Sequence, residues 1–233
     1  MKPRRIHPPP AVEVDDIHGE LEFPKFGPKD SGLPYVVMNM VSSLDGKVSV
    51  SGKSGAIGSA VDRNAMRVLR SKVDAVMVGA GTLRAEKVSL TSEGRRTPEP
   101  MAVIPSASLD LPLETNLLDA QKDRTLILAP DHAYEKASDV CLGHATLVSC
   151  KARPDGTLDI EDALRTLKRD FGIANLLVEG GSRLNHEFVE RDITQEIFLT
   201  LSPKLLGGFS KEAPVAIEGN TFEKSKRMLL TSI

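Results

Sequence analysis

The sequence predicts an α/β protein with a largely parallel central sheet and helices on both faces. Short apolar segments such as Val73–Val78 and Asn175–Val178 lack the polar alternation of a half-exposed strand, which suits strands buried on both faces. These segments alternate along the chain with helical segments such as Asp159–Phe171, whose apolar side chains share one face. Alternating helices and buried strands indicate a largely parallel sheet.

Length and composition narrow the class of protein further. The chain has 233 residues, 40% of them hydrophobic and 27% charged, with a formal net charge of -2, so it resembles an ordinary globular protein of one large domain or two small ones. This charge balance gives no sign of a nucleic-acid or membrane partner, and no apolar run approaches a membrane span or a signal peptide. The two cysteines, Cys141 and Cys150, favour reduced thiols in a cytoplasmic protein, and the five scattered histidines favour no metal site.

Residues 1–33 differ from the rest because they hold few apolar residues and six prolines, at positions 3, 8, 9, 10, 24 and 28. We interpret them as an extended arm that folds over the domain or over a partner. Residues 34–233 are then expected to form a single domain.

The first half of this domain begins with a strand, a loop and a helix. Tyr35–Val41 is expected to be a strand that leads to a tight turn at Leu44–Gly46. The Gly/Ser-rich residues 51–58 predict a loop. A helix is expected over residues 60–70, because a Ser-x-x-Asp capping pattern begins at Ser59.

The middle of the chain predicts strands separated by a turn and a loop. The buried strand Val73–Val78 ends at the glycine turn Gly79–Thr82, which opens a short helix. Residues Glu86–Pro100 are polar and predict a long loop. Two short strands are expected after it, at Met101–Ile104 and Thr125–Ala129.

The second half repeats the alternation of helix and strand. His132–Val140 predicts a weak helix, Ala145–Ser149 a strand, and Asp159–Phe171 a strongly amphipathic helix that ends at Gly172. The chain then completes a β-α-β unit whose strand, helix and strand are expected at Asn175–Val178, Ser182–Arg191 and Glu196–Leu201.

Two strand–glycine–helix junctions are candidates for binding an anion, at Val78–Thr82 and Val178–Ser182. Glycines let the backbone approach a ligand closely, and the free amides and dipole of the next helix attract negative charge. The first junction has Arg84 where a dinucleotide fingerprint requires a third glycine, so the motif is incomplete. Each glycine pair is also compatible with a tight turn that has no ligand.

Two carboxylates near turns are candidate functional groups. Asp45, before Gly46, could be a general acid or could simply form the turn. Glu179 lies at the carboxyl end of a buried strand beside a glycine turn, where open α/β sheets bind ligands. Its alternative role is to favour the dipole of the following helix.

Taken in order, these segments resemble a known family. The matching stretches are Asn39–Lys47, Ser54–Arg70, Val78–Thr82, Leu177–Gly181 and Ser202–Gly208. They resemble the riboflavin-biosynthesis pyrimidine reductases, which comprise the C-terminal reductase domain of the bifunctional deaminase-reductase and its stand-alone relatives. The resemblance covers roughly residues 34–220 and implies a three-layer, dihydrofolate-reductase-like fold and a homodimer.

The resemblance also implies a reaction. In this family NADPH reduces the ribosylamino side chain of a pyrimidine 5′-phosphate to a ribitylamino chain, by adding hydride to C1′ of the ring-opened sugar. The substrate is 5-amino-6-(5-phosphoribosylamino)uracil or its 2,5-diamino-pyrimidinone analogue. Such chemistry belongs to the cofactor, while the protein supplies orientation and charge, which agrees with a sequence that lacks a nucleophile motif.

Binding residues follow by position from the resemblance. Substrate contacts are expected from Asn39, Ser54, Arg70, Leu90 and Glu179. Cofactor contacts are expected from Ser42, Ala56, Thr82, Glu86, Ser106, Gly180, Gly181, Ser182, Arg183 and Leu184. Glu179 would accept hydrogen bonds from pyrimidine N–H groups, and Arg183 would meet a phosphate. Arg70 would contact the substrate phosphate or ribose, or would only favour the helix dipole from a solvated position.

The segment from Glu86 to Arg96 departs from the family pattern. Glu86-Lys87-Val88 replaces Asp-Asp-Pro, and Glu93 replaces a basic residue, which leaves Arg95 or Arg96 as substitutes. These changes keep two alternatives open: a reductase of a related pterin or dihydrofolate-like substrate, and a dimeric nucleotide-binding protein without turnover. Near the chain end, the strand-like Arg227–Thr231 lies where family members often add a strand.

Overall fold

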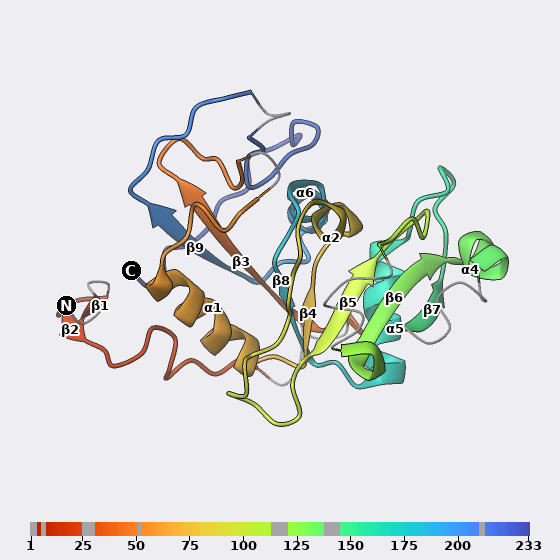
Figure 1. Ribbon diagram of the computed structural model, residues 1–233, viewed down its shortest axis with the longest axis horizontal. Coiled ribbons are helices and arrows are strands. Elements are labelled where there is room, and N and C mark those ends of the chain that lie inside the picture. The colour runs from red at the N-terminus through yellow and green to blue at the C-terminus, as the bar shows by residue number, and fades with distance from the viewer. Residues whose placement is uncertain are drawn as a thin grey trace.

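A computed structural model describes residues 4–5, 8–24, 31–50, 53–112, 121–137, 145–209 and 213–233. Its centre is one seven-stranded sheet with the strand order β7-β6-β5-β4-β8-β3-β9, and every neighbouring pair is parallel (Figure 1). The strands are β3 (Tyr35–Ser43), β4 (Ala75–Met77), β5 (Met101–Pro105), β6 (Thr125–Pro130), β7 (Thr146–Cys150), β8 (Asn175–Val178) and β9 (Glu196–Ser202). The predicted α/β class with a mostly parallel sheet is therefore confirmed.

Helices connect these strands, and their ends follow the local sequence. They are α1 (Ala60–Ser71), α2 (Ala80–Ala85), the 3-10 helix η1 (Lys122–Arg124), α4 (Asp131–Ala137), α5 (Ile160–Phe171) and α6 (Ser182–Glu190). As the capping pattern predicts, the Ser59 side chain accepts a hydrogen bond from the Asp62 amide, and Gly172 ends α5 with a φ of 67°. Residues 138–140 of the predicted weak helix lie outside the described residues.

Alternate residues of each buried strand face two different apolar cores. In β3, Val36 and Met38 join the core beneath α5 and α6, whereas Val37 joins the core beneath α1 and α2. The same alternation divides Leu176 and Val178 from Leu177 in β8. All of these side chains are almost completely buried, which explains why the sequence of each strand is apolar without alternation. The result is three layers, with the sheet between two layers of helix.

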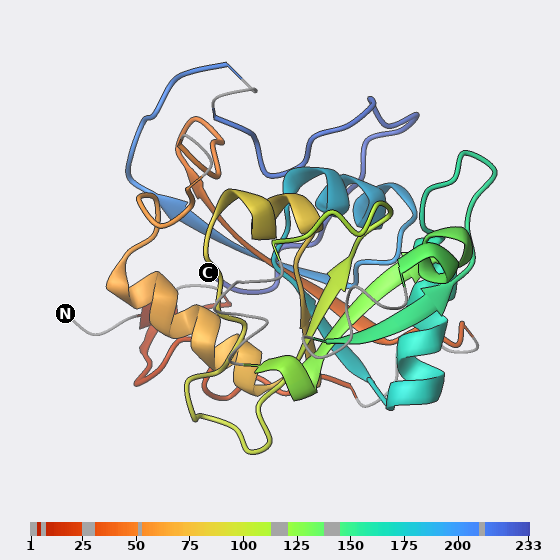
Figure 2. The same ribbon diagram turned by 45° about the vertical axis from the view of Figure 1, so that its right-hand side comes forward.

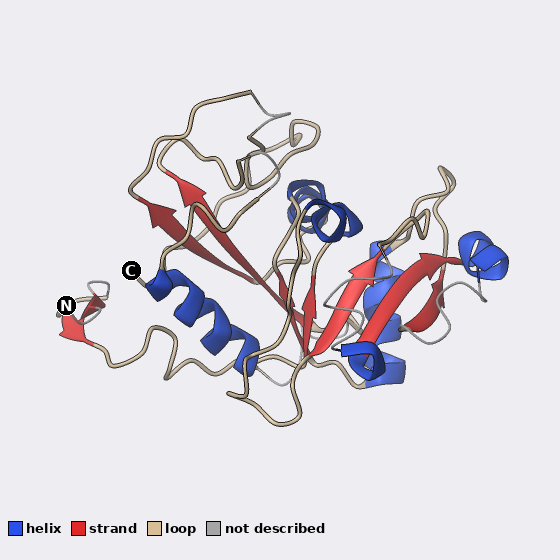
Figure 3. Cartoon of the chain, in the orientation of Figure 1, coloured by secondary structure: helices blue, strands red, loops and turns tan. Residues whose placement is uncertain are grey.

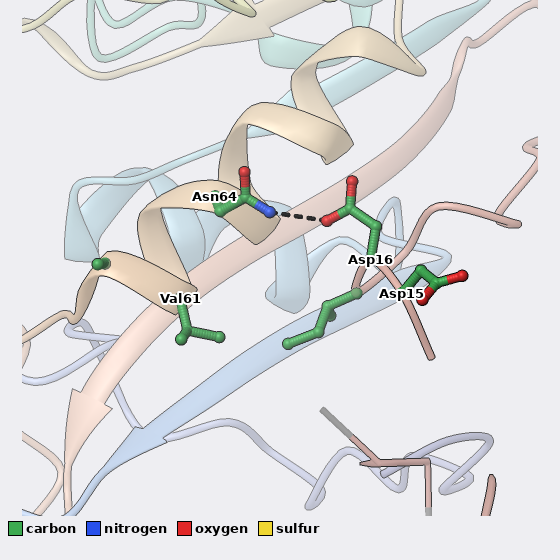
Figure 4. Close-up of a pocket in the computed structure, with 6 residues that line it drawn as sticks. Asp15, Asp16, Val61 and Asn64 are labelled. Atoms are coloured by element: carbon green, nitrogen blue, oxygen red, sulfur yellow. Dashed lines mark hydrogen bonds between the residues drawn. The ribbon is translucent and has the colours of Figure 1, made fainter. Parts of the chain in front are cut away.

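The N-terminal arm packs on its own domain. It contains a small antiparallel pair, β1 (Arg4–Arg5) with β2 (Val12–Glu13), which the expectation of an extended arm did not include. The rest of its described part is mostly loop (Figure 3). Asp16 accepts a 2.7 Å hydrogen bond from the Asn64 side chain on α1, beside a hollow of about 260 Å³ (Figure 4). The Lys72 ammonium donates to the carbonyl of Gly19 at 2.9 Å, so the arm follows α1 for most of its length.

Aromatic contacts fix the arm against the edge of the sheet near β9. The His18 ring packs edge-on against Phe198, with ring centres 4.7 Å apart, and Phe23 lies between Tyr35 and Phe198. Burial lowers the pKa of His18 below its ordinary value of 6.5, although the nearby Asp16 carboxylate raises it in part. The docked arm therefore favours the neutral imidazole.

Docking of the arm is expected to weaken in mild acid. Because the pKa of His18 is lower in the docked state, the undocked arm binds the proton more readily, and the stabilisation present above pH 6.5 declines as the pH falls below that value. We expect the unfolding free energy in urea to decrease between about pH 7.5 and pH 5.5 more steeply in the parent than in His18→Phe, which keeps the ring contact without the titration. Parallel pH profiles of the two proteins would contradict this role.

Strand β9 is an edge of the sheet and part of its surface is bare. Leu199 and Leu201 are 53% and 61% exposed. Residues Arg227–Thr231, which we predicted to be strand-like, form no strand, and Met228, Leu229 and Leu230 are exposed. The expected strand at the chain end is therefore wrong, and β9 remains the last strand on this side of the sheet.

Candidate active site at the carboxyl edge of the sheet

A cavity of about 880 Å³ lies at the carboxyl ends of the central strands. Its wall combines the ends of β3, β4, β5 and β8 with α1 and with the first turns of α2 and α6. Figures 1 and 2 both show α2 and α6 side by side at this edge of the sheet. The volume is in the range of small-molecule sites, and the position is where open α/β sheets bind ligands.

Most of the predicted site residues meet in this cavity. Those that line it are Asn39, Ser54, Arg70, Thr82, Glu86, Leu90, Ser106, Glu179, Gly181, Ser182, Arg183 and Leu184. Three others do not line it. Ser42 is buried, Gly180 lies behind Gly181 with its carbonyl accepting from the Gly79 amide, and the Ala56 carbonyl accepts from Lys204.

The two glycine junctions form one paired structure. The Gly79 amide donates to the Gly180 carbonyl at 2.7 Å, which joins the end of β4 to the end of β8. A Cβ on Gly181 would lie 3.1 Å from the Thr82 hydroxyl, so a side chain there would require that hydroxyl to move by a few tenths of an ångström. No side chain caps the start of α6 at Gly181. The first amides of this helix therefore point toward the cavity without an intrahelical partner.

Arg70 and Glu179 form a buried ion pair at the cavity floor. The Arg70 Nε donates to Glu179 Oε1 at 2.8 Å and a terminal nitrogen donates to Oε2 at 2.6 Å, while the two side chains are only 7% and 10% exposed. The other terminal nitrogen donates to the carbonyls of Ser89 and Thr91. Burial by itself lowers the pKa of Arg70, but attraction to Glu179, with hydrogen bonds and two further carboxylates, raises it overall. The guanidinium thus joins the carboxylate of β8 to the backbone of the following loop.

The segment from Glu86 to Arg96, whose sequence differs from the family pattern, is held by several hydrogen bonds and ion pairs. The Glu86 carboxylate accepts hydrogen bonds from both the amide and the hydroxyl of Ser54, and both residues line the cavity. Glu93 instead pairs with Arg67 at 2.8 Å, on the outside of α1. The carboxylate of Glu99 accepts from Ser92 and Gly94, and although burial opposes the shift, these hydrogen bonds lower its pKa.

Arg95 and Arg96, the arginines expected to substitute for the basic residue that Glu93 replaces, bind groups outside the cavity. Arg95 donates to Asn64 at 2.5 Å and lies 3.7 Å from Asp16 of the arm. Arg96 pairs with Asp74 at 2.9 Å, and Asp74 also accepts from the amides of Ala174 and Asn175. Neither arginine lines the cavity.

Asp45 forms the turn, the second of the two roles considered for it. Its carboxylate accepts hydrogen bonds from Ser43 at 2.6 Å and from the amides of Leu206 and Gly207. These bonds lower its pKa to about 2, so it is ionised at neutral pH, and it does not line the cavity. It therefore holds two loops together instead of supplying a proton.

Sequence reasoning missed several residues of the cavity wall. Besides Lys87, they include Asp62, Arg63 and Met66 of α1 and Glu218 of the C-terminal segment. A signal existed for α1, because residues 63, 66 and 70 are spaced three and four apart and share one helix face. No pattern in the sequence indicated Glu218, whose amide donates to the carbonyl of Ser182.

Comparison with known proteins places the chain in one family. The sequence model of the family described as "RibD C-terminal domain" matches residues 34–233. The chain is 34% identical over 205 residues to the 2,5-diamino-6-ribosylamino-4(3H)-pyrimidinone 5′-phosphate reductase of Aquifex aeolicus, covering 84% of this chain and 88% of the relative. The reductase of the same name from Archaeoglobus fulgidus is 30% identical, with 84% and 91% covered.

Solved structures show the same fold. Acinetobacter baumannii RibD superposes with a TM-score of 0.67 at 23% identity, covering 82% of this chain and 51% of that one. The riboflavin biosynthesis reductase Rib7 of yeast superposes with a TM-score of 0.64 at 20% identity, covering 88% and 89%. The chain thus spans about half the length of RibD and most of Rib7. These likenesses confirm the predicted dihydrofolate-reductase-like fold.

The described residues contain neither a membrane-spanning helix nor a cluster of metal ligands. No helix among them is long and apolar enough to cross a membrane. In the same part of the chain, no group of three or more histidine, cysteine, aspartate or glutamate side chains could hold a metal ion.

Proposed function

The chain belongs to the RibD C-terminal domain family, and from that premise we propose that it is the pyrimidine reductase of riboflavin biosynthesis. Its substrate would be 2,5-diamino-6-ribosylamino-4(3H)-pyrimidinone 5′-phosphate, the compound after which its relatives from Aquifex and Archaeoglobus are named, or the corresponding 5-amino-uracil. The observation that carries the proposal is the Glu179 carboxylate at the cavity floor, held from one side by Arg70 and beside an open glycine turn. A cytoplasmic location, expected from composition, belongs to the same proposal.

NADPH is the proposed cofactor, and the residues present fit it. The first amides of α6 lie free at Gly181, and the absent Cβ leaves space where the pyrophosphate would approach the backbone. Thr82 and Ser106 also line the cavity, and Arg183 is an exposed cation in the first turn of α6. When bound, the dinucleotide supplies the hydride for reduction at the sugar carbon.

The chain's own groups would orient the substrate. Each Glu179 oxygen accepts one hydrogen bond from Arg70 and retains a lone pair for a pyrimidine N–H group. Because Arg70 is nearly buried and also bonded to two carbonyls, the carboxylate has little freedom to turn away. Such fixed placement of a recognition group is how a reductase brings a substrate carbon to its cofactor.

The test is oxidation of NADPH, followed by its absorbance, with the ribosylaminopyrimidine phosphate as substrate and the ribitylamino product identified by mass. Turnover with this product supports the proposal. Turnover of dihydrofolate or a pterin alone would favour the related reductase. Tight NADPH binding without turnover of any of these would favour the nucleotide-binding protein instead.

We also propose that the protein is a homodimer formed through the β9 edge. The support is an unpaired edge strand that exposes Leu199 and Leu201, an arrangement that soluble proteins usually cover. Light scattering should give the mass of two 25.2 kDa chains for the parent. The Leu199→Glu/Leu201→Glu variant should give one chain, and Tyr134→Glu, on α4 at the far end of the sheet, should remain dimeric. A parent with the mass of one chain would refute the dimer.

A further inference from the structure

The proposed substrate carries a phosphate, but the cations expected to receive it are already engaged. Arg70 has its guanidinium on Glu179 and on the carbonyls of Ser89 and Thr91. Arg95 and Arg96 are bonded outside the cavity. A phosphate dianion in a cavity needs positive charge within hydrogen-bond distance, so other groups must supply it.

Two cations of the cavity wall are free to do so. Arg63 of α1 and Lys87 of the following loop both line the cavity and are exposed. Across the described part of the chain, neither side chain makes a hydrogen bond or an ion pair. The backbone at both residues is nevertheless held in place. Arg63 is in the first turns of a capped helix, and Lys87 follows Glu86, whose carboxylate accepts two hydrogen bonds from Ser54.

The spacing along α1 suits a sugar phosphate. Arg63, Met66 and Arg70 form one stripe of the helix, and all three line the cavity. Seven residues of helix separate Arg63 from Arg70 by about 10 Å along the axis. A pyrimidine placed against Glu179 would therefore have its phosphorylated sugar chain directed along this stripe, past Met66, toward Arg63.

The other cations of the cavity lie closer to the proposed cofactor. Arg84 donates to the carbonyl of Asp110 in the loop after β5, and Arg183 is in the first turn of α6. Two acids are their neighbours in the sequence, Asp62 beside Arg63 and Glu86 beside Lys87, and the Glu86 carboxylate is occupied by Ser54. Asp62 is the remaining negative group on this part of the wall.

We propose that Arg63 and Lys87 together bind the substrate 5′-phosphate in this chain. This inference rests on the proposed function for the identity of the ligand. It makes the first turns of α1 and the segment after Glu86 the determinants of phosphate specificity. Met66 would pack on the carbon chain between the pyrimidine and phosphate ends of the site.

The experiment compares phosphorylated and dephosphorylated ligands. For the ribosylaminopyrimidine phosphate, Arg63→Ala and Lys87→Ala should each raise KM roughly 10-fold or more with little change in kcat, since a charge-assisted hydrogen bond to phosphate is lost. The same variants should leave the KM for the dephosphorylated substrate unchanged, and Arg63→Lys should recover part of the effect. Arg67→Ala is the matched control, because it lies on the same helix, pairs with Glu93 and does not line the cavity.

A binding measurement separates failure of this inference from failure of the proposed function. Ribose 5-phosphate should bind to the parent by calorimetry and much less to Arg63→Ala/Lys87→Ala, whereas ribose should not distinguish the two. If the parent does not reduce the pyrimidine but shows this difference, the proposed function fails and the phosphate site stands. Equal binding of ribose 5-phosphate to the parent and to the double variant would overturn the inference, and so would an unchanged KM in an active double variant.

Discussion

Replacing Arg70 with alanine is expected to remove about 3–5 kcal/mol of unfolding free energy and to abolish most activity, because it leaves the Glu179 carboxylate buried without its partner. The pair is bidentate and both side chains are at most 10% exposed, so little solvent is available to replace the lost guanidinium. The carbonyls of Ser89 and Thr91 would lose a donor at the same time. Urea unfolding followed by circular dichroism measures the first effect, and NADPH oxidation the second.

Two variants separate the roles of this ion pair. Arg70→Met/Glu179→Met removes both charges and should regain much of the stability while remaining inactive, since a buried ion pair adds little net stability over apolar side chains. Arg165→Ala removes an exposed pair with Glu161 and should cost less than about 1 kcal/mol. An Arg70→Ala protein as stable as the parent would show that the buried pair is not important for the fold. A fully active double variant would remove Glu179 from the site.

Replacing Gly181 with aspartate is expected to weaken NADPH binding roughly 100-fold or more, or about 3 kcal/mol. The new Cβ would meet the Thr82 hydroxyl at 3.1 Å, and the new carboxylate would occupy and repel the place where free helix amides face the cavity. The fold should survive, because Gly181 has an ordinary φ of -72°. Titration of NADPH fluorescence measures the dissociation constant.

The matched controls for this position are Gly181→Asn and Gly181→Ala. Asparagine has nearly the shape of aspartate without its charge, so the difference between the two variants isolates repulsion of the pyrophosphate. Alanine tests the lack of space alone and should have the smallest effect. If all three variants bind NADPH like the parent, the glycine turn is not the cofactor site, and the proposal that NADPH binds at this turn fails.

The sequence predicted the fold because the signals involved are local. The strand Asn175–Val178 was predicted to the residue, and the helices around Ala60 and Asp159 begin at the caps that Ser59 and Asp159 supply. Hydrophobic period, capping and glycine turns depend on a few neighbouring residues, so a single sequence reveals them. Arg227–Thr231 has a composition that suits a strand but forms none, and strand pairing is not a local property.

The site residues were also predicted largely by position, and most of them line one cavity. The tertiary structure decided which partner each charged side chain pairs with. The sequence analysis named Arg70 as a phosphate or ribose contact and Arg95 or Arg96 as substitutes for a missing basic residue. The fold brings each of them beside an acceptor that is distant in the chain, and Glu179 lies 109 residues from Arg70.

By itself, then, the sequence determined the α/β class, the succession of strands and helices along the chain, and the glycine turn beside Glu179. Only the three-dimensional arrangement showed that the arm lies on α1, that Asp45 forms a turn, and that Arg63 and Lys87 remain free at the cavity. The physical reason is that secondary structure follows from neighbouring residues, whereas the pairing of a charge depends on which distant groups the folded chain brings within hydrogen-bond distance.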